Sequence, residues 1–377
     1  MAGLYLHIPF CKTKCIYCDF YSVTDCSAQK AFLSRLREEL RERRDELPEG
    51  EKVRTIYFGG GTPSLLSPSE LEPLLETIRD CYPLAPEPLE VTMECNPGDL
   101  SAFRARELLA LGINRFSIGA QSFDPAALRF LSRRHTPAET KALVRLLRDA
   151  GADNLTLDLI YAIPGTTLET LRRDLEELVA LRPDHISAYS LMYEEGTPLF
   201  RGLQERKVTE VDEDTALEMG RLVRAFLSEK GYEQYEISNF KRLDPARDLR
   251  SRHNSSYWDG TPYLGFGPSA HSYVHPVRSW NPSDLGRYLA REPREMETLT
   301  AEMVYEEYLL TRLRTSEGID LDRIRALIGS PEAYEAFEAR ALDFTRGPEP
   351  LLIRQGTRLR LTSAGIDLSD ALLRHLA

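Results

Sequence analysis

Short apolar runs alternate with amphipathic stretches through roughly the first half of the chain. The runs are apolar at nearly every position, which is typical of strands buried on both faces of a parallel sheet. They occupy residues 4–8, 53–58, 89–95, 115–120, 154–159 and 185–190. The stretches between them have helix boundary signals, such as Ser67-Pro68-Ser69-Glu70 at a start and Ala150-Gly151 at an end. This alternation predicts an α/β fold with six βα units, as a parallel sheet or a barrel over residues 1–190.

The pattern becomes irregular after residue 190. We interpret residues 191–297 as an extension of the barrel rather than as a further set of βα units. Its recognisable parts are a helix near 212–230, a strand-like run at 232–240, and a stretch rich in glycine and aromatic residues at 253–273.

The last part of the chain, residues 298–377, predicts a separate small domain. Helices are expected at 302–315 and within 320–345, and a hairpin is expected where 351–354 and 358–362 flank Gly356. Helices followed by a hairpin indicate a winged-helix-like α+β domain. This fold does not by itself imply DNA binding, because fold and function separate readily.

Composition narrows the class of protein. The chain has 377 residues, of which 42% are hydrophobic and 28% charged, as in soluble globular proteins. No apolar run reaches the ~20 residues of a bilayer-spanning helix, and no secretory signal precedes residue 4, so we expect a cytoplasmic protein. A formal charge of −11 repels nucleic-acid phosphates, so no nucleic-acid partner is expected.

Three of the six cysteines form a cluster directly after the first apolar run. Their spacing is Cys11-x-x-x-Cys15-x-x-Cys18, and thiolates this close can face one inorganic cluster. Ordinary clusters and structural zinc sites have four protein ligands, whereas three leave one metal position open for a small molecule. A zinc knuckle remains an alternative, with Cys26 as the local candidate for a fourth ligand. Free cysteine is a common core residue, which explains Cys81 and Cys95.

Polar and glycine residues also mark the other apolar runs: the glycine run follows the second, Glu94 and Gln121 end the third and fourth, and Asp158 lies in the fifth. In a βα barrel, the loops at the carboxyl ends of the strands gather into one site. Here those positions hold the cysteine loop, the glycine run 59–61, Glu94, Gln121 and Asp158. Three consecutive glycines let the backbone approach a ligand that any Cβ would obstruct. We therefore expect one site.

The cysteine spacing, with Tyr17 just before the third cysteine, resembles the radical S-adenosylmethionine (SAM) superfamily. That resemblance implies a partial (β/α)6 radical SAM barrel with a 4Fe-4S cluster on Cys11, Cys15 and Cys18 and SAM on the fourth iron. Within the superfamily, the strand-end residues resemble the oxygen-independent coproporphyrinogen oxidase branch. The SAM-site residues that this resemblance implies are Tyr5, Tyr17, Gly60, Gly61, Thr62, Glu94, Gln121, Arg133 and Asp158.

Two further segments indicate which group of that branch the chain resembles. True dehydrogenases have another cysteine two residues after the third, and Phe20 stands there in this chain. The segment His253-Asn254-Ser255-Ser256-Tyr257-Trp258 resembles the His-Asn-x-x-Tyr-Trp motif of HemW-type heme chaperones. Histidine is a standard heme ligand and aromatic rings can cover a porphyrin, so the resemblance implies that His253 binds heme. His271 and His275 are rival ligands.

The resulting interpretation is a heme chaperone. It binds heme and a SAM-ligated 4Fe-4S cluster, and it transfers heme to an acceptor apo-hemoprotein, for which a membrane-associated hemoprotein is one option. The heme propionates need cations, and the nearby candidates are Arg247, Arg250 and Arg252. The alternative is an oxygen-independent coproporphyrinogen III dehydrogenase, and whether SAM is ever cleaved stays open. A third reading, an RNA-modifying enzyme, conflicts with the acidic charge.

Overall fold

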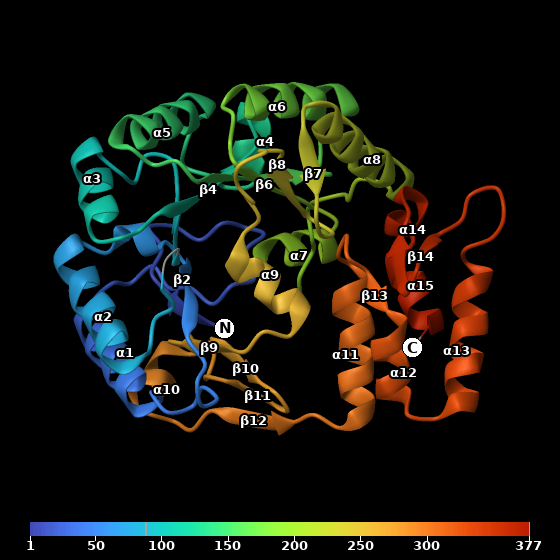
Figure 1. Ribbon diagram of the computed structural model, residues 1–377. Helices are drawn as coiled ribbons and strands as arrows, with labels where there is room; N and C mark the ends of the chain where they lie inside the picture. The colour runs from blue at the N-terminus through green and yellow to red at the C-terminus, as the bar shows by residue number, and fades with distance from the viewer. Residues whose placement is uncertain (87–88, 377) are drawn as a thin grey trace.

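A curved parallel sheet covered by helices forms the main body of the protein (Figure 1). The computed structural model describes residues 1–86 and 89–376. The predicted α/β fold is confirmed, because all six expected strands form and pair in parallel from the first to the sixth. These strands are β1 (Ala2–Ile8), β2 (Val53–Gly60), β3 (Glu90–Cys95), β4 (Arg115–Gln121), β5 (Leu155–Tyr161) and β6 (His185–Ser190).

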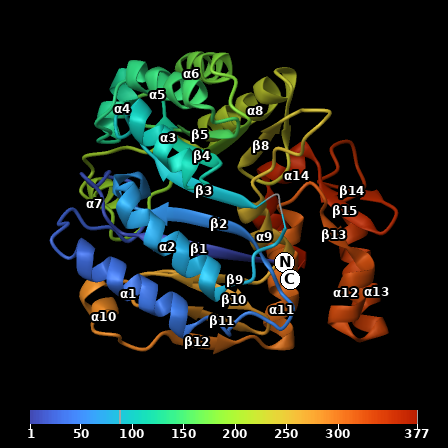
Figure 2. The ribbon, with the colours of Figure 1, turned by 60° about the vertical axis from the view of Figure 1, so that its left-hand side comes forward.

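Helices lie on the outer side of this sheet, and the apolar strand residues pack beneath them in one continuous core (Figures 1 and 2). Helix starts follow ordinary capping chemistry, as in the capping box of Ser67 and Glu70 before α2. The helices of the barrel are α1 (Gln29–Glu42), α2 (Pro68–Cys81), α3 (Ala102–Ala110), α4 (Pro125–Phe130), α5 (Pro137–Ala150) and α6 (Leu168–Ala180), with a 3₁₀ turn, η1, at Pro63–Leu65.

The extension continues the same sheet at both edges, which the sequence pattern does not show. The strand-like run at 232–240 is a hairpin of two short strands that adds to β6. At the other edge, β9 pairs in parallel with β1, and three antiparallel strands follow. The new elements are α7 (Pro198–Gln204), α8 (Glu213–Glu229), β7 (Tyr232–Gln234), β8 (Asn239–Arg242), α9 (Arg252–Asp259), β9 (Tyr263–Phe266), β10 (His271–Val274), β11 (Val277–Trp280), α10 (Leu285–Leu289) and β12 (Glu295–Thr298).

The complete sheet has twelve strands among the described residues, in the order β12-β11-β10-β9-β1-β2-β3-β4-β5-β6-β8-β7. Strands β9 to β12 lie alongside β1 and β2, as Figure 2 shows. The carboxyl ends of β1 to β6 therefore point to one edge, which is where the candidate site lies. Outside residues 87–88 and 377, no helix combines the length and the apolar character that crossing a bilayer needs.

The C-terminal part has its own small sheet and its own hydrophobic core, and it lies beside the barrel (Figure 1). The expected hairpin forms as β14 and β15, and the helices before it are close to their predicted bounds. The elements are α11 (Ala301–Leu313), β13 (Ile319–Asp320), α12 (Leu321–Ile328), α13 (Pro331–Asp343), β14 (Leu352–Gln355), β15 (Arg358–Leu361), α14 (Ser363–Asp367) and α15 (Ser369–Leu376).

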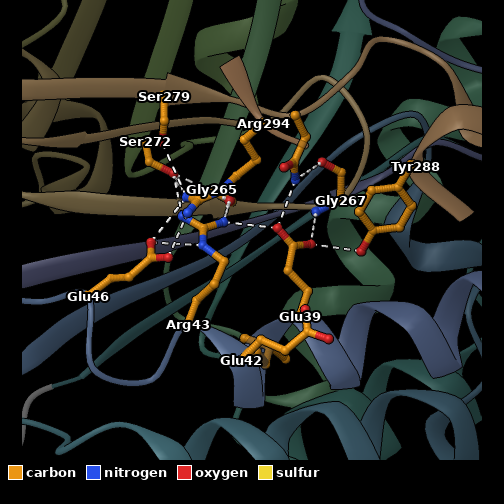
Figure 3. Close-up of polar contacts among 12 residues, drawn as sticks. Glu39, Glu42, Arg43, Glu46, Gly265, Gly267, Ser272, Ser279, Tyr288 and Arg294 are labelled. Carbon is orange, nitrogen blue, oxygen red and sulfur yellow. Dashed lines mark hydrogen bonds and ion pairs between the residues drawn. The ribbon is translucent and has the colours of Figure 1, made fainter. Parts of the chain in front are cut away.

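A buried ion pair on α1 attaches the extension to the barrel (Figure 3). The Glu39 carboxylate accepts hydrogen bonds from Arg43, Asn281, the Gly267 amide and the Tyr288 hydroxyl, at 2.7–3.0 Å. Arg43 also donates to the Gly265 carbonyl oxygen at 2.5 Å. Both carboxylate oxygens of Glu39 are thus satisfied, and its partners other than Arg43 come from segments more than 220 residues away in sequence.

Replacing Arg43 by methionine is expected to destabilise the protein strongly. The variant leaves the Glu39 carboxylate buried without its cation, which typically costs about 3–5 kcal/mol. Chemical denaturation of the wild type and the variant measures the loss in the free energy of unfolding. Arg41→Met, on the exposed face of the same helix, is the matched control and is expected to change that free energy by less than about 0.5 kcal/mol. Equal stability of the two variants would contradict the prediction.

Candidate functional site

The cysteine loop begins where β1 ends, and backbone hydrogen bonds fix its two ends to each other. The Cys11 amide donates to the Val23 carbonyl oxygen at 2.9 Å, and the Val23 amide donates to that of Pro9 at 2.8 Å. Cys11, Cys15 and Cys18 are free thiols and half-buried. Cys26 is fully exposed instead.

Polar groups surround the cysteine sulfurs. The Thr62 hydroxyl donates to the Cys11 sulfur at 3.7 Å, and the Arg133 guanidinium donates to the Cys15 sulfur at 3.5 Å. Burial raises the pKa of Cys11, and it raises the pKa of Cys18 to about 11. The metal-free loop therefore holds Cys11 and Cys18 as neutral thiols, and binding a metal must release their protons.

The distances between the possible ligand side chains limit which metal group the cysteine loop can bind. Among the residues that the structure describes, no three His, Cys, Asp or Glu side chains gather tightly enough to share a single metal ion. In a 4Fe-4S cluster each cysteine binds a different iron, so the cluster accepts a wider arrangement. Three free thiols beside a hydroxyl and a guanidinium fit such a cluster.

The glycine run passes directly under the base of the cysteine loop. The Gly61 amide donates to the Ile8 carbonyl oxygen at 2.8 Å, and a Cβ on Gly61 would lie 2.7 Å from the Phe10 carbonyl oxygen. Gly60 has a φ of +105°, which favours glycine, and a Cβ there would meet the His7 ring. Close packing between β1 and β2 thus requires the glycines, and their expected role in SAM binding stays a prediction.

Two carboxyl groups lie inside the barrel, that of Glu94 near the end of β3 and that of Asp158 in the middle of β5. Loss of solvation raises the pKa of Glu94 to about 7 and that of Asp158 to about 6. Glu94 accepts hydrogen bonds from the Tyr57 hydroxyl at 2.9 Å and from the Gly60 amide at 3.1 Å. A carboxylate has about four acceptor positions, so Glu94 can still accept a bond from a ligand. Two acids of this kind suit a ligand with positive charge.

The remaining predicted residues lie between these acids and the cysteine loop. Arg133 donates to the Gly119 carbonyl oxygen at 2.7 Å and to the Asn96 side-chain oxygen as well as to Cys15. Gln121 has a φ of +66°, and its side-chain oxygen is buried without a hydrogen-bond partner in the described part of the chain. A buried acceptor of this kind calls for a donor from a bound molecule. Tyr17 lies near Arg133, and burial raises its pKa.

His253 lies at the opposite end of the barrel. Its ring is 1% exposed and fits between the amino-terminal halves of β1 and β2. The Nδ1 atom is 2.8 Å from the Thr55 hydroxyl and the Nε2 atom is 2.9 Å from the Tyr257 hydroxyl, while the ring stacks on Tyr57. Desolvation lowers the pKa of His253 to about 3. As folded here, His253 reaches a heme iron only if helix α9 moves away, so its ligand role stays a prediction.

The structure adds two residues that sequence reasoning did not single out. Tyr57 reaches the site from β2 and holds Glu94, and Asn96 bridges Arg133 and Thr62. Asn96 had a visible signal, because it follows Glu94 at a strand end and precedes a proline. Tyr57 had no such signal, because an aromatic residue within an apolar run is expected to belong to the hydrophobic core.

Comparisons with known proteins identify the class. The family model described as the radical SAM superfamily matches residues 5–178. The chain is similar over its full length, with a TM-score of 0.82 and 23% identity, to the structure titled coproporphyrinogen III oxidase (HemN) from Escherichia coli, covering 89% of that chain. The fold, the cysteine loop and this match define a radical SAM protein. A radical SAM domain implies a 4Fe-4S cluster and SAM.

Curated relatives narrow the class further. The protein named heme chaperone HemW from Mycobacterium tuberculosis is 36% identical over 99% of this chain and 94% of its own length. A relative of the same name from Lactococcus lactis is 37% identical over 85% of this chain and 83% of its own length. Radical S-adenosyl methionine domain-containing protein 1, mitochondrial, from Danio rerio is 32% identical over 99% of this chain and 86% of its own length. The chain belongs to this HemW family of radical SAM proteins.

Proposed function

We propose that this protein is a heme chaperone that binds heme and transfers it to an acceptor apo-hemoprotein. The supporting observation is the similarity to curated heme chaperones across nearly the whole chain, not only across the barrel. Phe20 adds to it. This side chain is 61% exposed beside Cys18, at the position where the dehydrogenases of the branch have a cysteine. A phenyl ring there supplies no thiol.

No observation favours the alternative, a coproporphyrinogen III dehydrogenase. The likeness to coproporphyrinogen III oxidase is 23% in sequence, so it supports the shared fold alone. Phe20→Cys is an instructive variant, because it restores the thiol and leaves the remainder of the loop unchanged. We expect neither the wild type nor this variant to convert coproporphyrinogen III anaerobically with SAM and a reductant.

Within this function, we propose that Cys11, Cys15 and Cys18 hold the 4Fe-4S cluster, and that Glu94, Gln121, Arg133 and Asp158 bind SAM. When bound, the cluster supplies an electron to SAM or a binding position that SAM occupies. Glu94 and Asp158 offer negative charge to the SAM cation, and Gln121 offers its unpaired acceptor oxygen. Arg133 orients the cysteine loop and offers a donor to a carboxylate. The walls of the proposed SAM site also include Gly60, Gly61, Thr62, Tyr5 and Tyr17.

SAM affinity is expected to rise with pH if Glu94 binds the amino group of SAM. Below its pKa of about 7, Glu94 is protonated and cannot pair with an ammonium group, and above it the carboxylate can. Between about pH 6 and pH 7.5 the association constant should rise roughly eightfold, in proportion to the ionised fraction of Glu94. Calorimetric titration of reconstituted protein measures it. Glu94→Gln should bind SAM more weakly and lose most of the rise, and an unchanged pH dependence in that variant would exclude Glu94 as the responsible group.

The function is tested on anaerobically reconstituted full-length protein. Hemin is titrated in, and the Soret band reports binding. Loaded protein is then mixed with an apo-hemoprotein, whose recovered absorbance or activity reports transfer. We expect both steps to proceed, and a wild type that shows no Soret shift would overturn the chaperone function. Running the transfer with a soluble and a membrane-embedded acceptor separates the two acceptor classes. We further propose that this transfer takes place in the cytoplasm.

A further inference from the structure

A groove separates strands β9 to β11 from helices α11 and α12. Its volume is about 500 Å³, within the ~300–1,000 Å³ range of small-molecule ligand sites. One end of the groove is formed by the carboxyl-terminal half of α9. Figure 1 shows α9, β9 to β11 and α11 where the C-terminal part adjoins the barrel. None of the cysteines or SAM-site residues lines it.

Strand β10 presents ring side chains to this groove. His271 and Tyr273 alternate along the strand and His275 follows it, so all three lie on one face. Tyr263 on the neighbouring strand pairs with Tyr273, with ring centroids 6.3 Å apart. On the other side, His271 stacks on its cross-strand partner Trp280 at 5.7 Å. The result is a wall of aromatic rings, tilted relative to one another, that includes two imidazoles.

The imidazole of His271 is available as a ligand. Its side chain is exposed, and neither ring nitrogen has a hydrogen-bond partner among residues 1–86 and 89–376. Partial desolvation in the groove and the nearby Arg278 lower the pKa of His271, so the ring is neutral near pH 7. Neutral imidazole is the form that binds iron. The Nδ1 atom of His275, by comparison, lies 3.5 Å from the Tyr273 hydroxyl.

The His-Asn-x-x-Tyr-Trp motif is divided between the barrel interior and this groove. His253 points into the barrel, with both ring nitrogens hydrogen-bonded, whereas Tyr257 and Trp258 line the groove. The hydrogen bond between His253 and the Tyr257 hydroxyl therefore fixes the position of one ring of the groove wall. In this structure His253 is a positioning residue for Tyr257.

Cationic side chains face the aromatic surface. Arg312 and Arg323 line the groove, and neither pairs with an Asp or Glu in the described part of the chain. Arg278 and Glu307 also line it, but they pair with each other, and Arg278 pairs with Glu297 at 2.6 Å as well. Two arginines thus remain for acidic groups on a ligand. A ring surface, an open imidazole and two cations match a flat iron porphyrin with propionates.

We propose that heme binds in this groove, with His271 as its axial ligand and with its propionates directed to Arg312 and Arg323. The inference rests on the proposed chaperone function and assigns that function a site. The neutral imidazole nitrogen donates its lone pair to the heme iron, and no atom changes oxidation state in this step.

The test is a hemin titration of reconstituted full-length wild type, His271→Ala, His275→Ala and His253→Ala. We expect His271→Ala to weaken hemin binding about tenfold or more and to shift the Soret band, since it removes the iron ligand. His275→Ala, four residues away on the same face, removes the rival imidazole and should weaken hemin binding less than His271→Ala does, with an unchanged Soret band. Cluster absorbance and circular dichroism show that each variant is folded.

The outcomes separate the site from the function. If the wild type binds hemin and His271→Ala binds it equally well with an unchanged Soret band, the assigned site is wrong and the chaperone function stands. Loss of binding in a folded His253→Ala alone would also overturn the assignment. A wild type that does not bind hemin would overturn both.

A second ligand tests the two arginines. Arg323→Ala should weaken binding of hemin but leave binding of hemin dimethyl ester, which lacks the propionate charges, unchanged. Equal weakening for both ligands would overturn the role of Arg323. A general loss of structure would weaken binding of both ligands, so a loss confined to hemin reports the contact between Arg323 and a propionate.

Discussion

Cys15→Ser is expected to abolish assembly of the 4Fe-4S cluster. Serine removes one of three thiolates, and two are too few to hold the cluster on a half-exposed loop. After anaerobic reconstitution, iron and sulfide content should fall below about a tenth of the wild-type values, because metal binding depends on the full ligand set. Visible absorbance and EPR of the reduced protein measure the same loss.

Cys26→Ser is the control for this experiment. Cys26 is exposed, and its sulfur contacts the Thr24 carbonyl oxygen at 3.9 Å. We expect full iron and sulfide content in this variant. Loss of the cluster in Cys26→Ser, together with its retention in Cys15→Ser, would instead show that the ligand set differs from the three cysteines of the loop.

Gly265→Ala is expected to disrupt the joint between the barrel and its extension. A Cβ on Gly265 would lie 2.1 Å from the carbonyl oxygen and 2.9 Å from the carbonyl carbon of His271, and the backbone of β10 would have to move. The free energy of unfolding should fall by about 3 kcal/mol or more, at the upper end of overpacking effects. The same displacement would move His271, so hemin binding should weaken as well.

Denaturant unfolding and limited proteolysis of the segment after residue 262 measure this effect. Gly220→Ala, in helix α8, is the matched control, since its Cβ would make ordinary contacts of 3.4 Å or more with the Tyr161 and Arg224 side chains. That variant should equal or exceed the wild type in stability, because alanine favours a helix by up to about 1 kcal/mol over glycine. Equal stability of Gly265→Ala and Gly220→Ala would contradict the expected backbone clash.

The strands of the barrel were predictable because a strand that is buried on both faces is apolar at nearly every position, and such a run is visible in the sequence. Five of the six predicted strands differ from the observed ones by one to three residues at their ends, and residues 185–190 match. The ends shifted where polar or small residues still pair in the sheet, as with Tyr161 and Gly60. The apolar pattern of the sequence alone does not indicate which residues at such positions pair with the neighbouring strand.

The extension was far less predictable. Strand β9 has four residues and gains its place only by pairing with β1, from which it is separated by more than 250 residues. The glycines of the 264–270 stretch are explained by contacts that no local pattern contains, such as the approach of Gly265 to the backbone of His271. A short strand at such a distance depends on long-range pairing rather than on its own composition.

The amino-acid sequence alone was enough to predict the parallel strands of the barrel, the three-cysteine loop and the strand-end residues that we propose as the SAM site. These features repeat at fixed positions relative to local strands, and the topology of a parallel barrel then brings them together. Only the tertiary structure decided that His253 faces the barrel interior while Tyr257 and Trp258 face a groove with His271. Which side of a short helix is buried depends on what packs against it, and here that is β1, β2 and α11, none of which lies close to α9 in sequence.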